Sequence, residues 1–333
     1  MPRQARLDYT GALQHVISRG VGRCRIFDDG GDRDRFLGWL GKLLEESGAQ
    51  CLAWALLGNH FHLLMRTGKW PLKVLMQRLL TRYSVHYNLR HRRSGHLFQN
   101  RYKSILCEEE PYLLELARYS HLNPLRAGEV KSYAELAKYP WCGHGAVLGT
   151  RNVEWQATEE VLEGFGRSRS TARRAYNEFV KEGVGKGRRP EFAGGGLFRS
   201  VGGVEEVVRL VRRREKVASD ERILGSGDYV AEVLREVEHR DRRKAGMRER
   251  MDPRQVVERA AAVMGVEAGD VYGRRKVRKV SMARSLASKW LVEDLGMTVT
   301  AAARMLKVTP AAVVYGIRTG REVEVARRAK LSN

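Results

Sequence analysis

The sequence predicts an α+β fold, in which an antiparallel sheet with helices on one face precedes an all-α C-terminal region containing a helix-turn-helix. Up to about residue 150, short runs of strand character alternate with segments of helical apolar spacing. After that point the spacing is helical only, and the end of the chain carries helix start and stop signals. The expected domains are residues 1–150, a helical, basic linker at 151–250, and a helix-turn-helix domain at 251–333.

The elements of the first region are expected in the order strand, helix, two strands, helix, strand, helix. Gly58-Asn59 supplies the turn of a hairpin between the two consecutive strands. Pro71 suits the first turn of the second helix, and Pro124 with Gly128 is expected to end the third. The expected elements cover residues 11–20, 33–48, 51–58, 60–67, 71–92, 97–109 and 109–128.

The chain is strongly basic, with a formal net charge of +22 over 333 residues. Such an excess favours a polyanionic partner, either nucleic acid or an anionic membrane. We expect no membrane partner, because no apolar run approaches the length that spans a bilayer and MPRQARLDYT lacks the apolar segment of a secretory signal. The four cysteines are far apart and form no CxxC pair, which predicts free thiols in a reducing cytoplasm.

His60 and His62 are separated by one residue at the start of an expected strand. Side chains two apart on a strand point to the same face, so both imidazoles project side by side while Phe61 and Leu63 enter the core. Two imidazoles are a workable half of a metal site. The spacing alone is a weak signal, because nine histidines in 333 residues produce roughly a quarter of such a pair by chance.

The last expected helix of this region offers further groups for a site. Glu115, Tyr119 and Asn123 are four residues apart and form one polar stripe. Asn123 can offer a carbonyl oxygen as a third ligand, and Tyr119 would stand one turn away as a nucleophile toward a phosphodiester polarised by the metal. The alternative is a half-buried tyrosine with its hydroxyl in water. Spacing does not distinguish Tyr119 from Tyr112 on the same helix or from Tyr102 on the preceding strand.

Two stretches of the first region, GNHFHLLMRT and GHLFQNRYKSILCEEEPYLLELARYSHLNPLRAGEV, resemble the IS200-type tyrosine transposase family. More narrowly, they resemble the transposases associated with repetitive extragenic palindromes (REP). The resemblance covers about residues 3–145 and implies a ferredoxin-like sheet with the His-hydrophobe-His pair on a central strand. The chain departs from the family at Gly58, where many relatives have proline, and after Trp141, where Cys-Gly-His replaces a common Ser-Ser-Tyr run.

The resemblance also implies a chemistry. His60 and His62 would hold a divalent metal, Mg²⁺ or Mn²⁺, Asn123 matches the place of a third polar ligand, and Tyr119 matches the nucleophile. The chain would then be a HUH-type tyrosine transposase, a single-stranded DNA endonuclease and strand transferase. It would cut and rejoin hairpin-forming repeat DNA through a 5′-phosphotyrosine intermediate.

A basic stretch with interleaved aromatic rings follows the second expected helix. We expect it to grip phosphates and to offer Tyr87 and Phe98 as stacking surfaces for unpaired bases, although a solvated helix end is an equal alternative. Its basic residues are Arg90, Arg92, Arg93 and Arg101.

The other histidines are interpreted as ordinary residues. His15, on the first expected strand, is interpreted as an ordinary, partly buried histidine, with a place near the site as the alternative. His121 is not expected to be a ligand because it points about 160° from Asn123 on a helix. Three further histidines are interpreted as basic surface residues: His86, His91 and His96.

The C-terminal segment TVTAAARMLKVTPAAVVYGIRTG has the punctuation of a helix-turn-helix, with Thr309 as N-cap and Pro310 at the first helical position. RRKVRK, at 274–279, is placed in a loop before a helix, where it can grip phosphates. Residues 255–322 resemble the DNA-binding domain of the bacterial replication initiator DnaA, although KVTPAAVVYG replaces its target-reading pattern. We expect duplex DNA binding to a different target; a helical oligomerisation bundle is the alternative. The expected DNA contacts are Arg274, Arg275, Lys276, Arg278, Lys279, Thr309, Tyr315 and Arg318.

Two other functions compete with DNA cleavage by Tyr119. One is a domesticated, non-cutting DNA-binding regulator of repeats or transcription, and the other is hydrolysis by metal-activated water, for which Tyr119 is dispensable. The expected partners are single-stranded or hairpin DNA and duplex DNA, with no membrane. The chain is expected to be a monomer or a homodimer in the cytoplasm, associated with the nucleoid.

Overall fold

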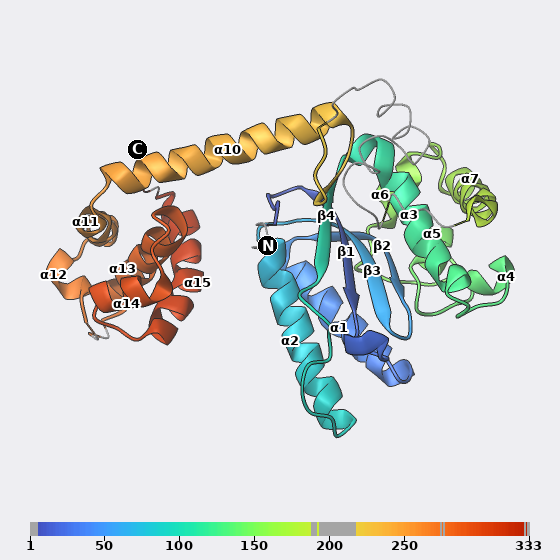
Figure 1. Ribbon diagram of the computed structural model, residues 1–333, viewed down its shortest axis with the longest axis horizontal. Coiled ribbons are helices and arrows are strands. Elements are labelled where there is room, and N and C mark those ends of the chain that lie inside the picture. The colour runs from blue at the N-terminus through green and yellow to red at the C-terminus, as the bar shows by residue number, and fades with distance from the viewer. Residues whose placement is uncertain are drawn as a thin grey trace. The chain divides into compact units, whose positions relative to one another are not determined.

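The computed structural model describes residues 6–187, 192, 218–273, 275, 277–329 and 331. The chain splits into two compact units, Met1–Glu232 and Val233–Asn333. The first unit is mixed α+β and the second is helical, as the sequence predicted (Figure 1). No helix of the described residues is long and apolar enough to cross a membrane.

The first unit is built on a five-stranded sheet in the order β2-β3-β1-β4-β5. Pairing is antiparallel except between β4 and β5, which run parallel. The first four strands and the two helices between them have the connectivity and order of a ferredoxin-like fold, as expected. The strands are β1 (Leu13–Arg19), β2 (Gln50–Leu56), β3 (His60–Arg66), β4 (Lys103–Cys107) and β5 (Ile223–Leu224).

Helices cover both faces of this sheet, which corrects the prediction that they share one face (Figure 1). Helices α1 (Gly30–Ser47) and α2 (Leu72–Arg90) pack on one face, against Phe61 and other side chains of β3. Helix α3 (Glu109–Arg126) packs on the opposite face, where Leu64 of β3 joins its core. The physical reason is that β2 is apolar on both faces, with Trp54 in one core and Leu52 in the other, so each face has to be covered.

Two boundaries differ from the predicted ones. The strand expected at 97–109 is confined to β4, and the residues before it form only an isolated bridge, between Gly20 and Phe98. Helix α3 continues through Pro124 and ends at Arg126, between the two predicted stop residues Pro124 and Gly128.

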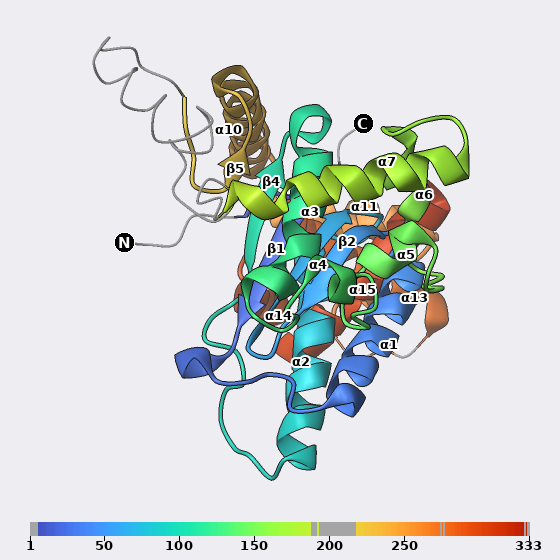
Figure 2. The same ribbon diagram turned by 90° about the vertical axis from the view of Figure 1, so that its right-hand side faces the viewer.

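The back of α3 is covered by short helices that follow it in the chain (Figure 2). They are α4 (Tyr133–Leu136), α5 (His144–Leu148), α6 (Thr158–Glu163) and α7 (Arg169–Glu182). The region at 151–250 was expected to be helical and also contains α10 (Gly227–Arg250), but it contributes the unpredicted edge strand β5 as well. The Gly-rich breaks expected at 194–196 and 202–203 lie outside the described residues.

The second unit is a helical bundle whose core surrounds the fully buried Trp290. Helices α13 (Arg278–Lys289) and α15 (Pro310–Arg327) approach so closely that a Cβ at Gly320 would lie 2.2 Å from the carbonyl oxygen of Ser285. The elements after α10 are α11 (Pro253–Met264), α12 (Ala268–Val271), α13 (Arg278–Lys289), a π-helical turn (Trp290–Asp294), α14 (Val299–Met305) and α15 (Pro310–Arg327).

Candidate active site

The His60–His62 pair lies at the start of β3, directly after a tight hairpin. Gly58 and Asn59 form its turn, which the backbone hydrogen bond from Leu57 N to His60 O closes at 2.9 Å. As the strand periodicity predicted, both imidazoles lie on one face, with ring centres 5.2 Å apart. Helix α3 covers the same face. Thus the hairpin places the histidines at the start of a central strand, beneath the helix that carries Tyr119.

Each imidazole of the pair is held through its Nδ1 atom. Nδ1 of His60 lies 2.7 Å from Oδ1 of Asn59, and Nδ1 of His62 lies 3.0 Å from Nε2 of His15. Within the described part of the chain, Nε2 of neither His60 nor His62 has a hydrogen-bond partner. Metal-binding histidines show this pattern, in which a neighbour orients one ring nitrogen and the other is left for the ion.

Burial keeps both imidazoles neutral. It lowers the pKa of His60 to about 4, with a further contribution from the positive charge of Arg19. It also lowers the pKa of His62 well below its usual value, assisted by His15, His60 and Arg19. A neutral imidazole is the form that binds metals, so the pair is ready for a divalent ion at neutral pH without having to lose a proton. The residues present therefore fit a metal.

Tyr119 contacts the histidines directly. Its ring centre lies 5.7 Å from that of His62 and 5.9 Å from that of His15, both in edge-to-face geometry. Arg126 lies seven residues, or about two turns, further along the helix. Its guanidinium carbon is 5.5 Å from the centre of the Tyr119 ring. Tyr112 lies two turns before Tyr119 on α3, about 10 Å from it along the helix axis. The structure thus brings Tyr119 to the histidine pair, which spacing alone could not do.

Asn123 lies one turn beyond Tyr119 on α3 and is only 9% exposed. Its amide nitrogen donates to the carbonyl oxygen of Tyr119 at 2.9 Å, which leaves the side-chain carbonyl oxygen as its remaining polar group. Its assignment as a third ligand stays a prediction.

Strand β1 contributes two further residues to the surroundings of the histidine pair. His15 was expected to be partly buried, but it is 0% exposed and bonds to His62. Arg19 is exposed and lies directly opposite His60 in the β1–β3 register, so the two side chains share a face. The alternating positions of His15, Ile17 and Arg19 in the sequence indicate that their side chains share one face of the strand. Only the β1–β3 register shows that this face lies beside His60 and His62.

A second polar cluster lies behind α3, on the side away from Tyr119. His121 and His144 are both fully buried, with ring centres 5.6 Å apart, and Nδ1 of His121 bonds to the hydroxyl of Tyr176 on α7. Burial lowers the pKa of His144 to about 4, and burial together with the nearby His144 lowers the pKa of His121 well below its usual value. His121 therefore faces away from the site, as its helical angle predicted.

A third group could hold a cation by its ligand types alone. Asp28, Asp32 and His91 place one ligand atom each within 4.8 Å of one another. However, Arg90 already pairs with Asp29, at 2.7 Å, and with Asp32, so a guanidinium supplies the positive charge there. We interpret this cluster as a structural link between α1 and α2. His91 is consequently not the free surface residue that was expected.

The basic stretch after α2 is only partly available for DNA. Arg90 is engaged with two aspartates, whereas Arg92 and Arg101 are exposed. The expectation that Tyr87 stacks on bases is wrong, because its ring is buried in the core and its hydroxyl donates to Asp28. The guanidinium of Arg93 instead lies 5.7 Å from that ring, and Phe98 packs against the same core. The DNA contacts of the four arginines stay predictions.

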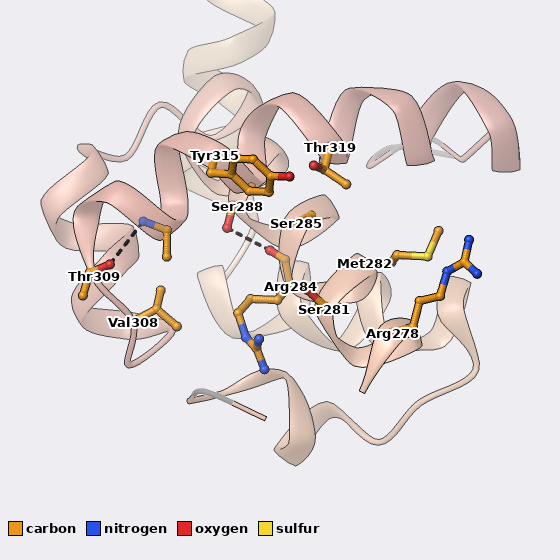
Figure 3. A pocket seen from close by; sticks show the side chains of 12 residues that line it. Arg278, Ser281, Met282, Arg284, Ser285, Ser288, Val308, Thr309, Tyr315 and Thr319 are labelled. Carbon is orange, nitrogen blue, oxygen red and sulfur yellow. Dashed lines mark hydrogen bonds between the residues drawn. The ribbon is translucent and has the colours of Figure 1, made fainter. Parts of the chain in front are cut away.

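In the second unit, the N-cap prediction for Thr309 is confirmed, because its hydroxyl accepts from Ala312 N at 3.2 Å. Tyr315 is 72% exposed on α15, and Arg318 is largely exposed with Glu322 4.0 Å away. Thr309 and Tyr315 line a pocket of ≈ 580 Å³ between α13 and α15 (Figure 3). A helix-turn-helix in the DNA-binding sense stays a prediction.

The basic run at 274–279 is not entirely a loop, since Arg278 and Lys279 form the first turn of α13. Both are exposed, and Arg278 reaches the pocket of Figure 3. Arg275 pairs with Asp270. Arg274 and Lys276 lie outside the described residues.

Comparison with known proteins agrees with the resemblance of the first region. The family model described as "Transposase IS200 like" matches residues 9–121. A solved structure of a REP-associated tyrosine transposase bound to a REP hairpin is similar at 14% sequence identity and a TM-score of 0.38, covering 47% of this chain and 92% of that one. No curated protein matches the chain. The similarity to this family model therefore extends over residues 9–121.

Proposed function

We propose that the chain cuts and rejoins single-stranded, hairpin-forming repeat DNA, using Tyr119 as the nucleophile and a divalent metal bound by His60, His62 and Asn123. The observation that carries this proposal is the contact between the Tyr119 ring and His62, within a histidine pair whose Nε2 atoms have no partner in the described residues. The proposal also assigns the chain to the HUH type of these enzymes and keeps Mg²⁺ or Mn²⁺ as the metal.

The chain's own residues perform most of the reaction. The Tyr119 oxygen forms a bond to the scissile phosphorus as the bond to the 3′-oxygen breaks, which leaves a 5′-phosphotyrosine and a 3′-hydroxyl. Arg126, beside the Tyr119 ring, favours the phenolate electrostatically as the proton leaves. A metal ion bound by His60 and His62 would polarise the phosphate as a Lewis acid. The phosphotyrosine retains the energy of the phosphodiester, so rejoining needs no ATP.

We further propose that the C-terminal part binds duplex DNA. The exposed first turn of α13, with Arg278 and Lys279, can contact phosphates, and the exposed face of α15, with Tyr315 and Arg318, can enter the major groove. A division into a catalytic domain at 1–150, a linker at 151–250 and a DNA-binding domain at 251–333 belongs to this proposal, as does action at the nucleoid.

A covalent-adduct assay tests the proposal. End-labelled single-stranded hairpin DNA is incubated with the full chain and Mn²⁺, and the products are separated on a denaturing gel. We expect a DNA–protein adduct that Tyr119→Phe abolishes. Tyr112→Phe is the matched control, because it removes a partly buried hydroxyl from the same helix and is expected to leave the adduct intact.

Each competing function has its own signature in this assay. Cleavage without an adduct, or an adduct that survives Tyr119→Phe, contradicts the tyrosine mechanism and favours metal-activated water. Binding of the hairpin without any cleavage in either Mg²⁺ or Mn²⁺ favours the non-cutting regulator.

A further inference from the structure

We infer that His15 is a positioning residue of the metal site: its Nε2 accepts a hydrogen bond from Nδ1 of His62 and so directs Nε2 of His62 toward the metal. This inference rests on the proposed function, since it concerns the metal of that same site. It adds a residue from β1, a strand that carries none of the groups assigned to the reaction so far.

The geometry that supports the inference is fully buried. The two nitrogens are 3.0 Å apart, the rings are stacked with centres 5.3 Å apart at 20°, and His15 is 0% exposed. In the β1–β3 register, His62 is opposite Ile17 and His15 is opposite Leu64, so the histidines are diagonal neighbours on one face. Water cannot replace the bond at such a position, and breaking it would leave a buried polar atom without a partner.

The hydrogen bond restricts His62 to one useful arrangement of its proton. A neutral imidazole carries one proton, and a nitrogen that binds a metal cannot also carry it. With the metal at Nε2, the proton of His62 lies on Nδ1, and His15 must then present Nε2 as an acceptor and hold its own proton on Nδ1. His15 thus favours the metal-binding form of His62 before any ion arrives.

His60 has an equivalent partner, which strengthens the inference. Oδ1 of Asn59 lies 2.7 Å from Nδ1 of His60 and can only accept, so His60 too is fixed with Nε2 outward. Both members of the pair therefore have an oriented Nδ1, one through the hairpin turn and the other through β1. His15 also touches the nucleophile, because its ring meets Tyr119 edge to face.

The test measures Mn²⁺ binding by calorimetry in the absence of DNA, with the full chain. His15→Phe keeps a flat ring but removes the acceptor, and we expect it to weaken Mn²⁺ binding by roughly 10- to 100-fold. His15→Gln supplies an amide oxygen that can accept the same bond, and we expect it to recover most of the affinity. His144→Gln, at a buried histidine on the far side of α3, is the matched control and should bind as the unaltered chain does.

The outcomes separate this inference from the proposed function. If His60→Ala abolishes Mn²⁺ binding while His15→Phe binds like the unaltered chain, the role of His15 is refuted and the metal site stands. If Mn²⁺ binds equally well after His60→Ala, or does not bind the unaltered chain, both fail. Thermal unfolding of each variant is recorded alongside; if both His15 variants lose affinity only in proportion to lost folding, His15 is a core residue and the inference is refuted.

Discussion

Replacing His144 by glutamine should remove part of the protein's sensitivity to acid. His144 is fully buried beside His121 and Tyr176, behind the helix that carries Tyr119. Burial lowers its pKa from 6.5 to about 4. Between these values the unfolded chain binds a proton that the folded chain does not, so the stability from this residue is complete above 6.5 and declines as the pH falls toward 4.

The size of the effect follows from the two pKa values. One pKa unit corresponds to about 1.4 kcal/mol, and lowering the pH from 7.5 to 5 covers enough of the window for His144 to cost about 2 kcal/mol. His62 and His121 have pKa values shifted in the same direction, so the unaltered chain should lose more than this in total.

Urea unfolding at pH 7.5 and pH 5, followed by tryptophan fluorescence, measures this loss. Five of the six tryptophans lie in the first unit, so the signal reports mainly on the part of the chain that contains His144. His144→Gln should reduce the difference in unfolding free energy between the two pH values by about 2 kcal/mol. His96→Gln, at an exposed position, is the control and should leave it unchanged. An equal acid loss in His144→Gln and in the unaltered chain would refute the reasoning.

Three further perturbations test other parts of the chain. Gly320→Ala would place a Cβ 2.2 Å from a carbonyl oxygen of α13, so it should destabilise the second unit by at least about 2 kcal/mol in thermal unfolding. The control is Gly269→Ala, whose Cβ would meet nothing within 4 Å and which should leave the stability of the second unit unchanged. Replacing Arg278 and Lys279 by alanine should lower the salt slope of duplex binding by roughly two, and an unchanged slope would mean that neither contacts phosphate. Arg19 is exposed opposite His60, where it can contact a DNA phosphate; Arg19→Ala should therefore weaken hairpin binding roughly tenfold while Arg19→Lys retains most of it, and equal affinities of Arg19→Ala and the unaltered chain would exclude this contact.

Local patterns made much of the first region predictable. The period of the strand placed His60 and His62 on one face, and the period of the helix placed Tyr119 and Asn123 one turn apart, because both patterns extend over only a few residues. The antiparallel core and the helical end of the chain followed from the same kind of signal.

The features that the sequence did not predict are contacts between segments that lie far apart in the chain. His15 meets His62 only through the β1–β3 register, which joins residues 47 positions apart. Tyr87 has the sequence context of a DNA-stacking ring, yet the packing of α2 on the sheet buries it. The placement of α3 on the opposite face from α1 and α2 likewise depends on tertiary packing, because the apolar stripe of a helix does not indicate which face of a sheet the helix will cover.

Helices α4 to α7 pack on the back of α3, and this packing limits which fragments of the chain can be produced alone. The family match ends at residue 121, inside α3, whose inward residues are buried with Tyr176 and Val180 of α7. A polypeptide cut shortly after Arg126 would expose that apolar surface to water and invite aggregation. The smallest fragment expected to remain soluble with Tyr119 correctly placed therefore extends beyond α7 and includes Phe192, whose buried ring lies 5.2 Å from that of Tyr119.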